Sequence, residues 1–268
     1  MFLGNDLVHW SGTAAREKET RTSRTQRFVD RVLHPQEHRL IAGLGVIRNR
    51  LAAVPLPHAH ALWALWAAKE ATFKAAVKAW PGLAFSPRSI RIEFLPRVPG
   101  HGGSERAWPL AQHLDSDHQI TAMRPLARGL AHIRDHVYEI LWEYHDEVVH
   151  AIAMGPFSQV RTDRHAQQHG DHWNGIVRMI TRIPSHRASQ AVRSIARHLL
   201  SVLPVPSLSG LPGRHVGIVR ELLETGRLGP PTFHDGAPRE DLDLTLTHDG
   251  PWGAAGILHR PAPAHCPH

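Results

Sequence analysis

The apolar positions of this chain fall into helical and strand-like segments that alternate along its length. Apolar residues at helical spacing predict a long helix over residues 59–80, which Pro81-Gly82 terminates. Residues 89–94 alternate between polar and apolar side chains, a pattern typical of a strand with one buried face. The other elements expected before residue 155 are a short strand running to Asp6, a helical stretch over 28–44 interrupted by Pro35, and two paired strands within 136–154.

The same succession of helix and strands restarts after a polar, histidine-rich stretch that begins at residue 158. The pattern there predicts a helix over 189–203 and strands over 216–219, 242–247 and 254–258. Helices beside alternating strands favour the α+β fold class. The expected organisation is a first lobe over 1–157, a histidine-rich linker over 158–184, a second lobe over 185–259 and a disordered, proline-rich tail over 260–268.

Composition places the chain among ordinary soluble proteins. Hydrophobic residues make up 42% and charged residues 21% of it, and no apolar run approaches the roughly 20 residues that cross a bilayer. The N-terminus turns acidic too soon for a secretory signal. A single cysteine, Cys266, excludes an intrachain disulfide. We therefore expect a cytoplasmic protein that does not bind membranes.

The charge balance favours acidic partners without choosing among them. The chain carries 31 Lys and Arg against 24 Asp and Glu, a formal charge of +7, and 23 histidines add to this charge at low pH. A basic surface attracts nucleic acids, anionic lipids and acidic proteins, and a GC-rich genome produces the same composition. Zinc-finger spacing and an aromatic RNA-binding signature are missing, which argues against a nucleic-acid partner.

Three short segments carry candidate chemistry. In Trp66-Ala67-Ala68-Lys69-Glu70-Ala71-Thr72-Phe73-Lys74 a carboxylate and a lysine lie four residues apart on the long helix. Asp6 ends the first strand, and Thr247-His248 ends a later alternating strand. Each has an ordinary structural alternative: an exposed helical ion pair, a turn or N-cap residue, and a hydrogen-bonded core histidine.

Together these segments suggest a metal and phosphate site. Magnesium is commonly held by one or two carboxylates, waters and substrate phosphates, and the pair Asp6 and Glu70 fits this pattern if the fold brings them together. Lys74 would then reach a pyrophosphate as a point charge. The hydroxyl of Thr247 and the imidazole of His248 are also groups that bond phosphate.

These residues resemble the motifs of the 4′-phosphopantetheinyl transferase superfamily. The resemblance rests on Gly4-Asn5-Asp6, on the Trp-x-x-Lys-Glu-x-x-x-Lys segment from Trp66 to Lys74, and on Thr247-His248. The segment from Arg27 to Glu37 adds further similarity, and weaker likeness appears over residues 230–238. Residues 100–188 contribute little.

The resemblance implies a reaction, a metal and its ligands. Members of the superfamily move the phosphopantetheine arm of coenzyme A onto a serine of a carrier protein, with magnesium (Mg2+). It implies that Asp6 and Glu70 bind the metal and that Glu70 and Lys74 act in catalysis. It further implies that Lys69, Lys74, Thr247 and His248 bind coenzyme A, and that the partner is an acidic acyl or peptidyl carrier protein.

The resemblance also implies a pseudo-dimer of two similar lobes, each a small antiparallel sheet packed against a long helix, in a monomeric protein. Two features differ from two-lobed members. Val8 stands where many of them have a second carboxylate, and the Thr-His strand follows the Gly-x-Asp segment instead of preceding it. We therefore expect the two lobes in swapped order, the first supplying metal ligands and the second binding the nucleotide.

Two other readings of the sequence stay open. His165, His169 and His172 have spacing that suits zinc, as in a zinc-dependent hydrolase, although Gly170 breaks helical continuity between them. The second reading is a relative that has lost activity and only binds coenzyme A or the carrier protein.

Overall fold

The computed structural model describes residues 1–9, 22–42, 58–95, 124–145, 147–158, 176–203, 216–224, 226 and 228–260. The first half contains β1 (Phe2–His9), α2 (Thr22–Val32), α3 (Pro35–Ala42), α5 (His58–Ala79), β2 (Arg91–Phe94), β3 (Arg124–Ile133), β4 (His136–His145) and β5 (Val148–Ser158). The second half contains β6 (Ile176–Arg182), α7 (Ala188–Val202), β7 (Gly217–Val219), β8 (Thr232–His234), β9 (Leu242–Asp249) and β10 (Trp252–His259).

The first half is a five-stranded antiparallel sheet packed against α5. Its strand order is β1-β5-β4-β3-β2, so the first strand pairs with the last. The helix face that meets the sheet is rich in alanine, which forms helices readily and lets backbones approach closely. Gly4 of β1 lies at the closest approach, because a Cβ there would stand 1.9 Å from the backbone oxygen of Ala71.

The second half repeats this order of connections on a smaller scale. Its three-stranded sheet has the order β6-β10-β9, again with the first strand paired to the last, and the helix α7 follows β6. Apolar residues on one stripe of α7 pack against the sheet, as the sequence periodicity predicts. They are Val192, Ile195, Ala196 and Leu199. The short strands β7 and β8 form a separate ribbon, and β8 contacts β9.

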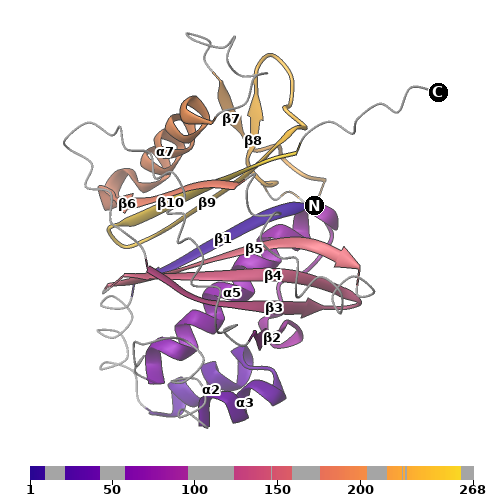
Figure 1. The fold of residues 1–268 in the computed structure, drawn as a ribbon, viewed down its shortest axis with the longest axis vertical. Coiled ribbons are helices and arrows are strands. Elements are labelled where there is room, and N and C mark those ends of the chain that lie inside the picture. Colours follow the sequence, from indigo (N-terminus) through magenta and orange to yellow (C-terminus); the bar gives the residue numbers. More distant parts are fainter. Residues whose placement is uncertain are drawn as a thin grey trace, which may run out of the picture.

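The two halves meet through β1, which lies between β5 of its own sheet and β9 of the other (Figure 1). The odd-numbered side chains of β1 face the second half. Leu3 packs with Leu258 and Ile176, and Leu7 packs with Trp252 and Ile180. The even-numbered positions face α5, where Val8 is buried in the core of the first half. One strand therefore has the first half's helix on one face and the second half on the other.

The predicted α+β class is confirmed, with antiparallel sheets and few helices. The predicted long helix, the helix over 189–203 and the paired strands within 136–154 are present. Pro35 begins a second helix, because proline is tolerated in the first helical turn, where its missing N–H has no partner to lose.

The predicted linker over 158–184 needs correction, because it contains β6, an edge strand of the second sheet that pairs with β10. The sequence of β6 alternates poorly, since both of its faces are largely covered. The strand β3 was also not predicted. The predicted loops over 13–21 and 99–104 and the tail beyond residue 260 lie outside the described residues. In the described part of the chain, no helix is long and apolar enough to cross a membrane.

Candidate functional site

The junction of the halves is built by side chains of β9 that hydrogen-bond the free edge of β1. The backbone N–H of Leu3 donates to the Asp243 carboxylate, and that of Asn5 donates to Thr245 Oγ1 at 3.0 Å. The N–H of His9 donates to Asp249 at 2.9 Å. The contacts recur at even spacing because alternate residues of a strand point to the same side. An edge that is normally prone to pairing with other chains is thus covered within the molecule.

Two lysines of α5 satisfy the carbonyl groups along the same edge. Lys78 donates to the Leu3 carbonyl at 2.6 Å and to Asp243 at 2.9 Å. One helical turn earlier, Lys74 donates to the Asn5 carbonyl at 3.1 Å. Burial lowers the pKa of Lys78, and the carboxylate of Asp243 opposes this shift. Lys78 is enclosed between the halves, whereas Lys74 is one-third exposed.

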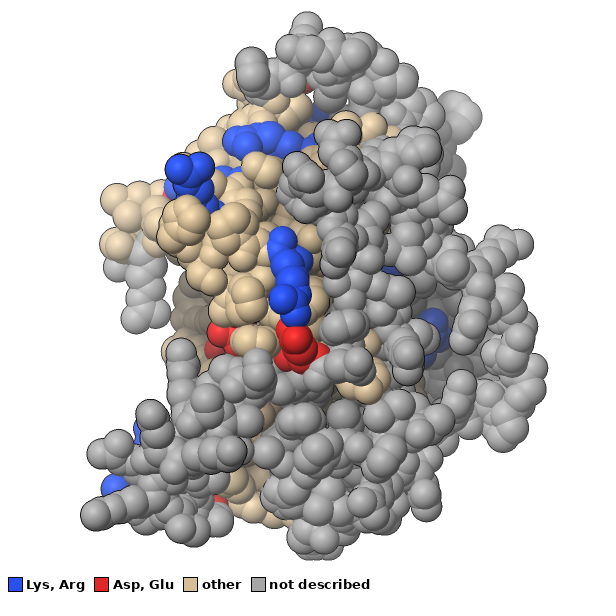
Figure 2. Space-filling model, turned by 90° about the vertical axis from the view of Figure 1, so that its left-hand side faces the viewer, with Lys and Arg blue, Asp and Glu red and all other residues tan. Residues whose placement is uncertain are grey.

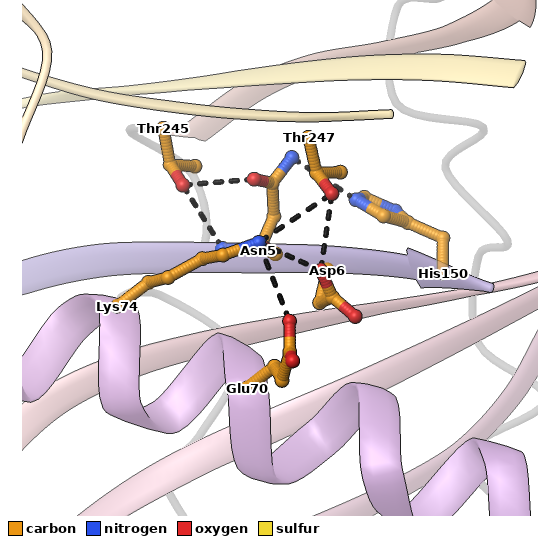
Figure 3. A network of polar contacts seen from close by, with 7 residues as sticks. All are labelled: Asn5, Asp6, Glu70, Lys74, His150, Thr245 and Thr247. Atoms are coloured by element: carbon orange, nitrogen blue, oxygen red, sulfur yellow. Dashed lines mark hydrogen bonds and ion pairs between the residues drawn. The ribbon is translucent and has the colours of Figure 1, made fainter. Parts of the chain in front are cut away.

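Around Lys74 the fold gathers most of the residues that the sequence motifs predicted. The ammonium lies 2.6 Å from Asp6 Oδ1, 3.4 Å from Thr247 Oγ1 and 4.0 Å from Glu70 Oε2. Thr247 also donates to Asp6 at 3.0 Å. Figure 3 shows these side chains directed toward one another from β1, α5 and β9. Residues far apart in sequence therefore form one cluster at the junction of the halves.

The two carboxylates of this cluster interact strongly. Burial first, and then the negative charge of Asp6, raise the pKa of Glu70 to about 7, while Lys74 acts in the opposite direction. Two acidic groups that share a site cannot both ionise easily, so near neutral pH one proton or one additional cation is favoured there. Glu70 is 29% exposed, whereas Asp6 is buried, so solvent reaches the pair from the side of Glu70.

The donor set of the cluster fits a magnesium ion. Asp6 and Glu70 supply carboxylate oxygens from two elements, and the mutual repulsion of the carboxylates is what a bound cation would relieve. Among the described residues, no group of three or more His, Cys, Asp or Glu side chains is placed to hold a metal ion. A site with two carboxylates leaves the remaining positions to water and phosphate oxygens, as magnesium prefers.

His248 and Thr247 lie on opposite faces of β9. Thr247 faces β1 and is buried, whereas His248 is exposed and pairs in register with Gly253 of β10. This follows from the alternation of side chains along a strand. The imidazole therefore stands outside the cluster around Lys74, and its assignment to the nucleotide remains a prediction.

The prediction that Lys69 contacts a phosphate does not agree with its position. Lys69 is fully buried and donates to Glu37 at 2.6 Å and to the Pro87 and Ile90 carbonyls at 3.0 and 2.6 Å. These contacts use the three hydrogens of its ammonium. Lys69 and Lys74 point to different sides because five residues correspond to about 140° of rotation on a helix. Lys69 connects α5 to α3 and β2 and is not part of the site.

Replacing Lys69 with Met is expected to destabilise the protein by about 3–5 kcal/mol, because it leaves the buried Glu37 carboxylate without its counter-ion. Urea unfolding measures the change. The double variant Lys69→Met, Glu37→Gln is expected to recover part of this loss, because it removes the uncompensated charge. An unchanged unfolding free energy in the single variant would contradict the buried ion pair.

Three residues of the site were not predicted from the sequence. Asn5 is a fully buried polar residue that precedes Asp6 on β1, Thr245 precedes Thr247 on the same face of β9, and Lys78 follows Lys74 by one helical turn. Side chains two residues apart on a strand, or four apart on a helix, point to the same side. This spacing is the signal in the sequence that could have identified these residues. His165, His169 and His172, the candidate zinc ligands, lie outside the described residues.

Comparison with known proteins gives one match. Residues 2–123 match the family model described as 4′-phosphopantetheinyl transferase superfamily, which confirms the predicted resemblance. The matched segment covers β1, α5 and β2, and thus contains Asp6, Glu70 and Lys74. No curated protein and no solved structure matches the chain.

Proposed function

Because residues 2–123 match the family model of the 4′-phosphopantetheinyl transferase superfamily, we propose that this protein transfers 4′-phosphopantetheine from coenzyme A to a serine of an acyl or peptidyl carrier protein, with Mg2+. The observation that carries the proposal is the cluster of Asp6, Glu70 and Lys74. It provides paired carboxylates for a cation beside an ammonium group for a phosphate.

The proposed architecture is a pseudo-dimer whose two lobes stand in swapped order. The repeated connection order supports it, since in each half a strand leads into a helix and then pairs with the last strand of its sheet. The proposed metal ligands come from the first lobe, and α7, the helix of the second lobe, contains no Asp or Glu. One site per chain follows, with Thr247 contributed by the second lobe.

Asp6 and Glu70 would hold the magnesium ion, which when bound supplies positive charge that offsets the negative charge of the pyrophosphate. The Lys74 ammonium can exchange its contact with Asp6 Oδ1 for a contact with a phosphate oxygen, because its flexible side chain is one-third exposed. There it would stabilise the 3′,5′-adenosine bisphosphate that departs when the bond to the β-phosphorus breaks. Thr247 would donate to the same nucleotide, and His248 would approach it from the rim of the second lobe.

Glu70 is the proposed general base. In the reaction, the serine oxygen forms a bond to the β-phosphorus and its proton passes to Glu70, directly or through a water molecule. A base works best when its pKa is near the working pH. Without a bound cation, burial together with Asp6 raises the pKa of Glu70 to about 7.

The basic surface of the second half supports an acidic partner. Lys and Arg side chains gather over the upper part of the face in Figure 2, and Asp and Glu lie where the halves meet. In the described sequence around α7 the ionisable residues are all basic. The arginines of this region are Arg182, Arg187, Arg193 and Arg197. An acidic carrier protein would be attracted to such a surface.

The test of the proposed function is intact-mass analysis of apo carrier proteins after incubation with the protein, coenzyme A and magnesium. A gain of one phosphopantetheine, lost in the Asp6→Ala variant, supports the proposal. Carriers from fatty acid, polyketide and peptide synthesis are compared in parallel. No gain with any of them, combined with no binding of coenzyme A in calorimetry, would refute it.

Magnesium affinity is expected to rise with pH up to about pH 7 and then to level off. Below that value the Glu70 carboxyl is mostly protonated, since its pKa is raised to about 7, and metal binding must displace the proton. The dependence should approach about tenfold per pH unit on the acidic side. Calorimetry in buffers of different ionisation enthalpy measures both the affinity and the released proton.

The Glu70→Gln variant is the control for this dependence, because it has no proton to release at this position. Its weaker binding should be nearly independent of pH in the same range. A wild-type affinity that does not change between about pH 5.5 and 8.5 would contradict the raised pKa of Glu70.

A further inference from the structure

A buried line of polar side chains crosses the junction of the halves directly beneath the site. It consists of Asn5 on β1, His150 on β5, Glu143 on β4 and Arg178 on β6. Asn5 and His150 are fully buried, and Glu143 is 4% exposed. Burial of polar groups is costly unless each is hydrogen-bonded, so a line of this kind restricts how its neighbours pack. The proposed reaction uses none of these side chains.

Asn5 is the point where this line meets the site. Its N–H donates to Thr245, and its Oδ1 accepts from the Thr245 hydroxyl at 2.8 Å. Its carbonyl accepts from Lys74, and its Nδ2 lies 3.3 Å from His150 Nε2 (Figure 3). All four polar groups of Asn5 are therefore engaged, with partners on β9, α5 and β5. Asp6 is the next residue along β1.

The contacts allow His150 one protonation state. Since the Asn5 Oδ1 accepts from Thr245, its Nδ2 is the donor to His150, and His150 Nε2 must accept. The proton then resides on Nδ1, which lies 3.4 Å from Glu143 Oε2. Burial lowers the pKa of His150 to about 3, with Lys74 acting in the same direction and Asp6 opposing it. The neutral imidazole thus orients the Asn5 amide.

The far end of the line belongs to the second half. Glu143 accepts from Arg178 Nε at 2.7 Å and from Arg178 Nη2 as well. Glu143 and His150 are direct cross-strand neighbours in the register of β4 and β5. His150 therefore connects two contacts between the halves: Asn5 with Thr245 on the site side, and Glu143 with Arg178 on the other side.

We propose that His150 is a positioning residue of the site, which fixes the Asn5 amide and thereby holds β9, with Thr247, in register with Asp6 and Lys74. This inference rests on the proposed function for its kinetic test only. The groups assigned to the chemistry, Glu70 and Lys74, stand on the first half. A shift of β9 would disturb the binding of a nucleotide that spans both halves more than it would disturb the chemical step.

The test compares His150→Leu with His150→Gln. Leu leaves the buried Asn5 Nδ2 without its acceptor, whereas Glu143 keeps its contacts to Arg178. An unsatisfied buried group costs enough to raise KM for coenzyme A about tenfold. The change in kcat is expected to stay within about threefold, because Glu70 is not displaced. Gln can accept from Asn5 and donate to Glu143, so it should restore most of the affinity.

A second variant separates positioning from stability. In Asn5→Leu, His150→Leu both partners of the Asn5–His150 contact are apolar, which removes the unsatisfied Asn5 Nδ2, while the Thr245 hydroxyl loses its acceptor. The unfolding free energy should therefore recover in part relative to His150→Leu, while KM for coenzyme A stays high. If KM instead returns to the wild-type value together with stability, His150 is a structural residue only and the proposal fails.

An NMR measurement decides the question without activity. The wild-type spectrum should show a neutral, Nδ1-protonated imidazole that is missing in His150→Gln, and the Thr247 methyl signal should shift in His150→Leu but stay in place in His150→Gln. A charged or Nε2-protonated ring, or a Thr247 signal unaffected by Leu, would overturn the positioning role. If the wild-type protein transfers nothing, the proposed function fails and this measurement still judges the inference.

Discussion

Replacing Glu70 with Gln is expected to abolish phosphopantetheine transfer while the protein remains folded. The substitution keeps the shape of the side chain but removes its ability to accept a proton and to bind a cation with a charged oxygen. Loss of a general base alone lowers the rate by about 10²- to 10⁴-fold. Intact-mass analysis of the carrier protein over a time course measures the residual rate.

The effect of Glu70→Gln on the stability of the protein, which serves as the folding control, has a predictable sign. The pKa of Glu70 in the folded protein, about 7, lies above the ordinary value of 4.5, so ionisation of this carboxyl weakens the folded state. This cost is absent below about pH 4.5 and complete above about pH 7. Glu70→Gln is therefore expected to be at least as stable as the wild type at pH 8, and the difference should vanish in acid.

Glu93→Gln provides the matched activity control. Glu93 is an exposed carboxylate of the same half, on β2, and lies outside the site. Its replacement should leave the transfer rate unchanged. Full activity in Glu70→Gln, or an equal loss in both variants, would refute the assignment of the base.

Gly4→Ala is expected to destabilise the protein strongly and to inactivate it at the same time. A Cβ at this position would stand 1.9 Å from the Ala71 oxygen and 2.7 Å from the Ala75 nitrogen, both backbone atoms of α5. No rotamer relieves such an overlap, so β1 and α5 must separate. Overpacking of a core costs about 1–3 kcal/mol and sometimes more, and a clash with backbone falls at the upper end.

The loss of activity in Gly4→Ala has a geometric cause. Asp6 stands on β1 and Glu70 and Lys74 stand on α5, so any separation of these elements pulls the two carboxylates and the ammonium apart. Urea unfolding and the transfer assay measure the two effects. Gly82→Ala is the control, because a Cβ at Gly82 has no atom within 4 Å. A Gly4→Ala variant of wild-type stability would show that the close approach is not needed.

The sequence predicted the site best where a motif and a periodicity coincide. Glu70 and Lys74 are one helical turn apart, so their common side follows from helix geometry alone. Asp6 was identified from its motif, but its distance to Glu70 was not, because the two residues are joined only through the packing of β1 on α5. The glycine at position 4 is the local feature that allows this packing.

The prediction that Lys69 contacts a phosphate failed because α5 has no single apolar face. This helix is apolar on several sides, and alanines bury it against the sheet while aromatic residues pack on other sides. The sequence pattern therefore does not indicate which lysine lies inside. Tertiary packing placed Lys69 against Glu37 and left Lys74 beside Asp6. The sequence also could not predict which of Thr247 and His248 faces β1. The alternation of side chains assigns them to opposite faces of β9 but does not tell which face meets β1.

By itself, the sequence determined the local elements, the α+β class and the identity of most residues that carry the candidate chemistry. These depend on periodicity and on short motifs, which act over a few residues. The tertiary structure decided which charged groups interact with one another and which groups are buried. It also decided that side chains of β9 cover the edge of β1. It also placed His150, one histidine among 23, on the Asn5 amide. Such contacts join residues far apart in the chain, and only the packing of the two halves brings them together.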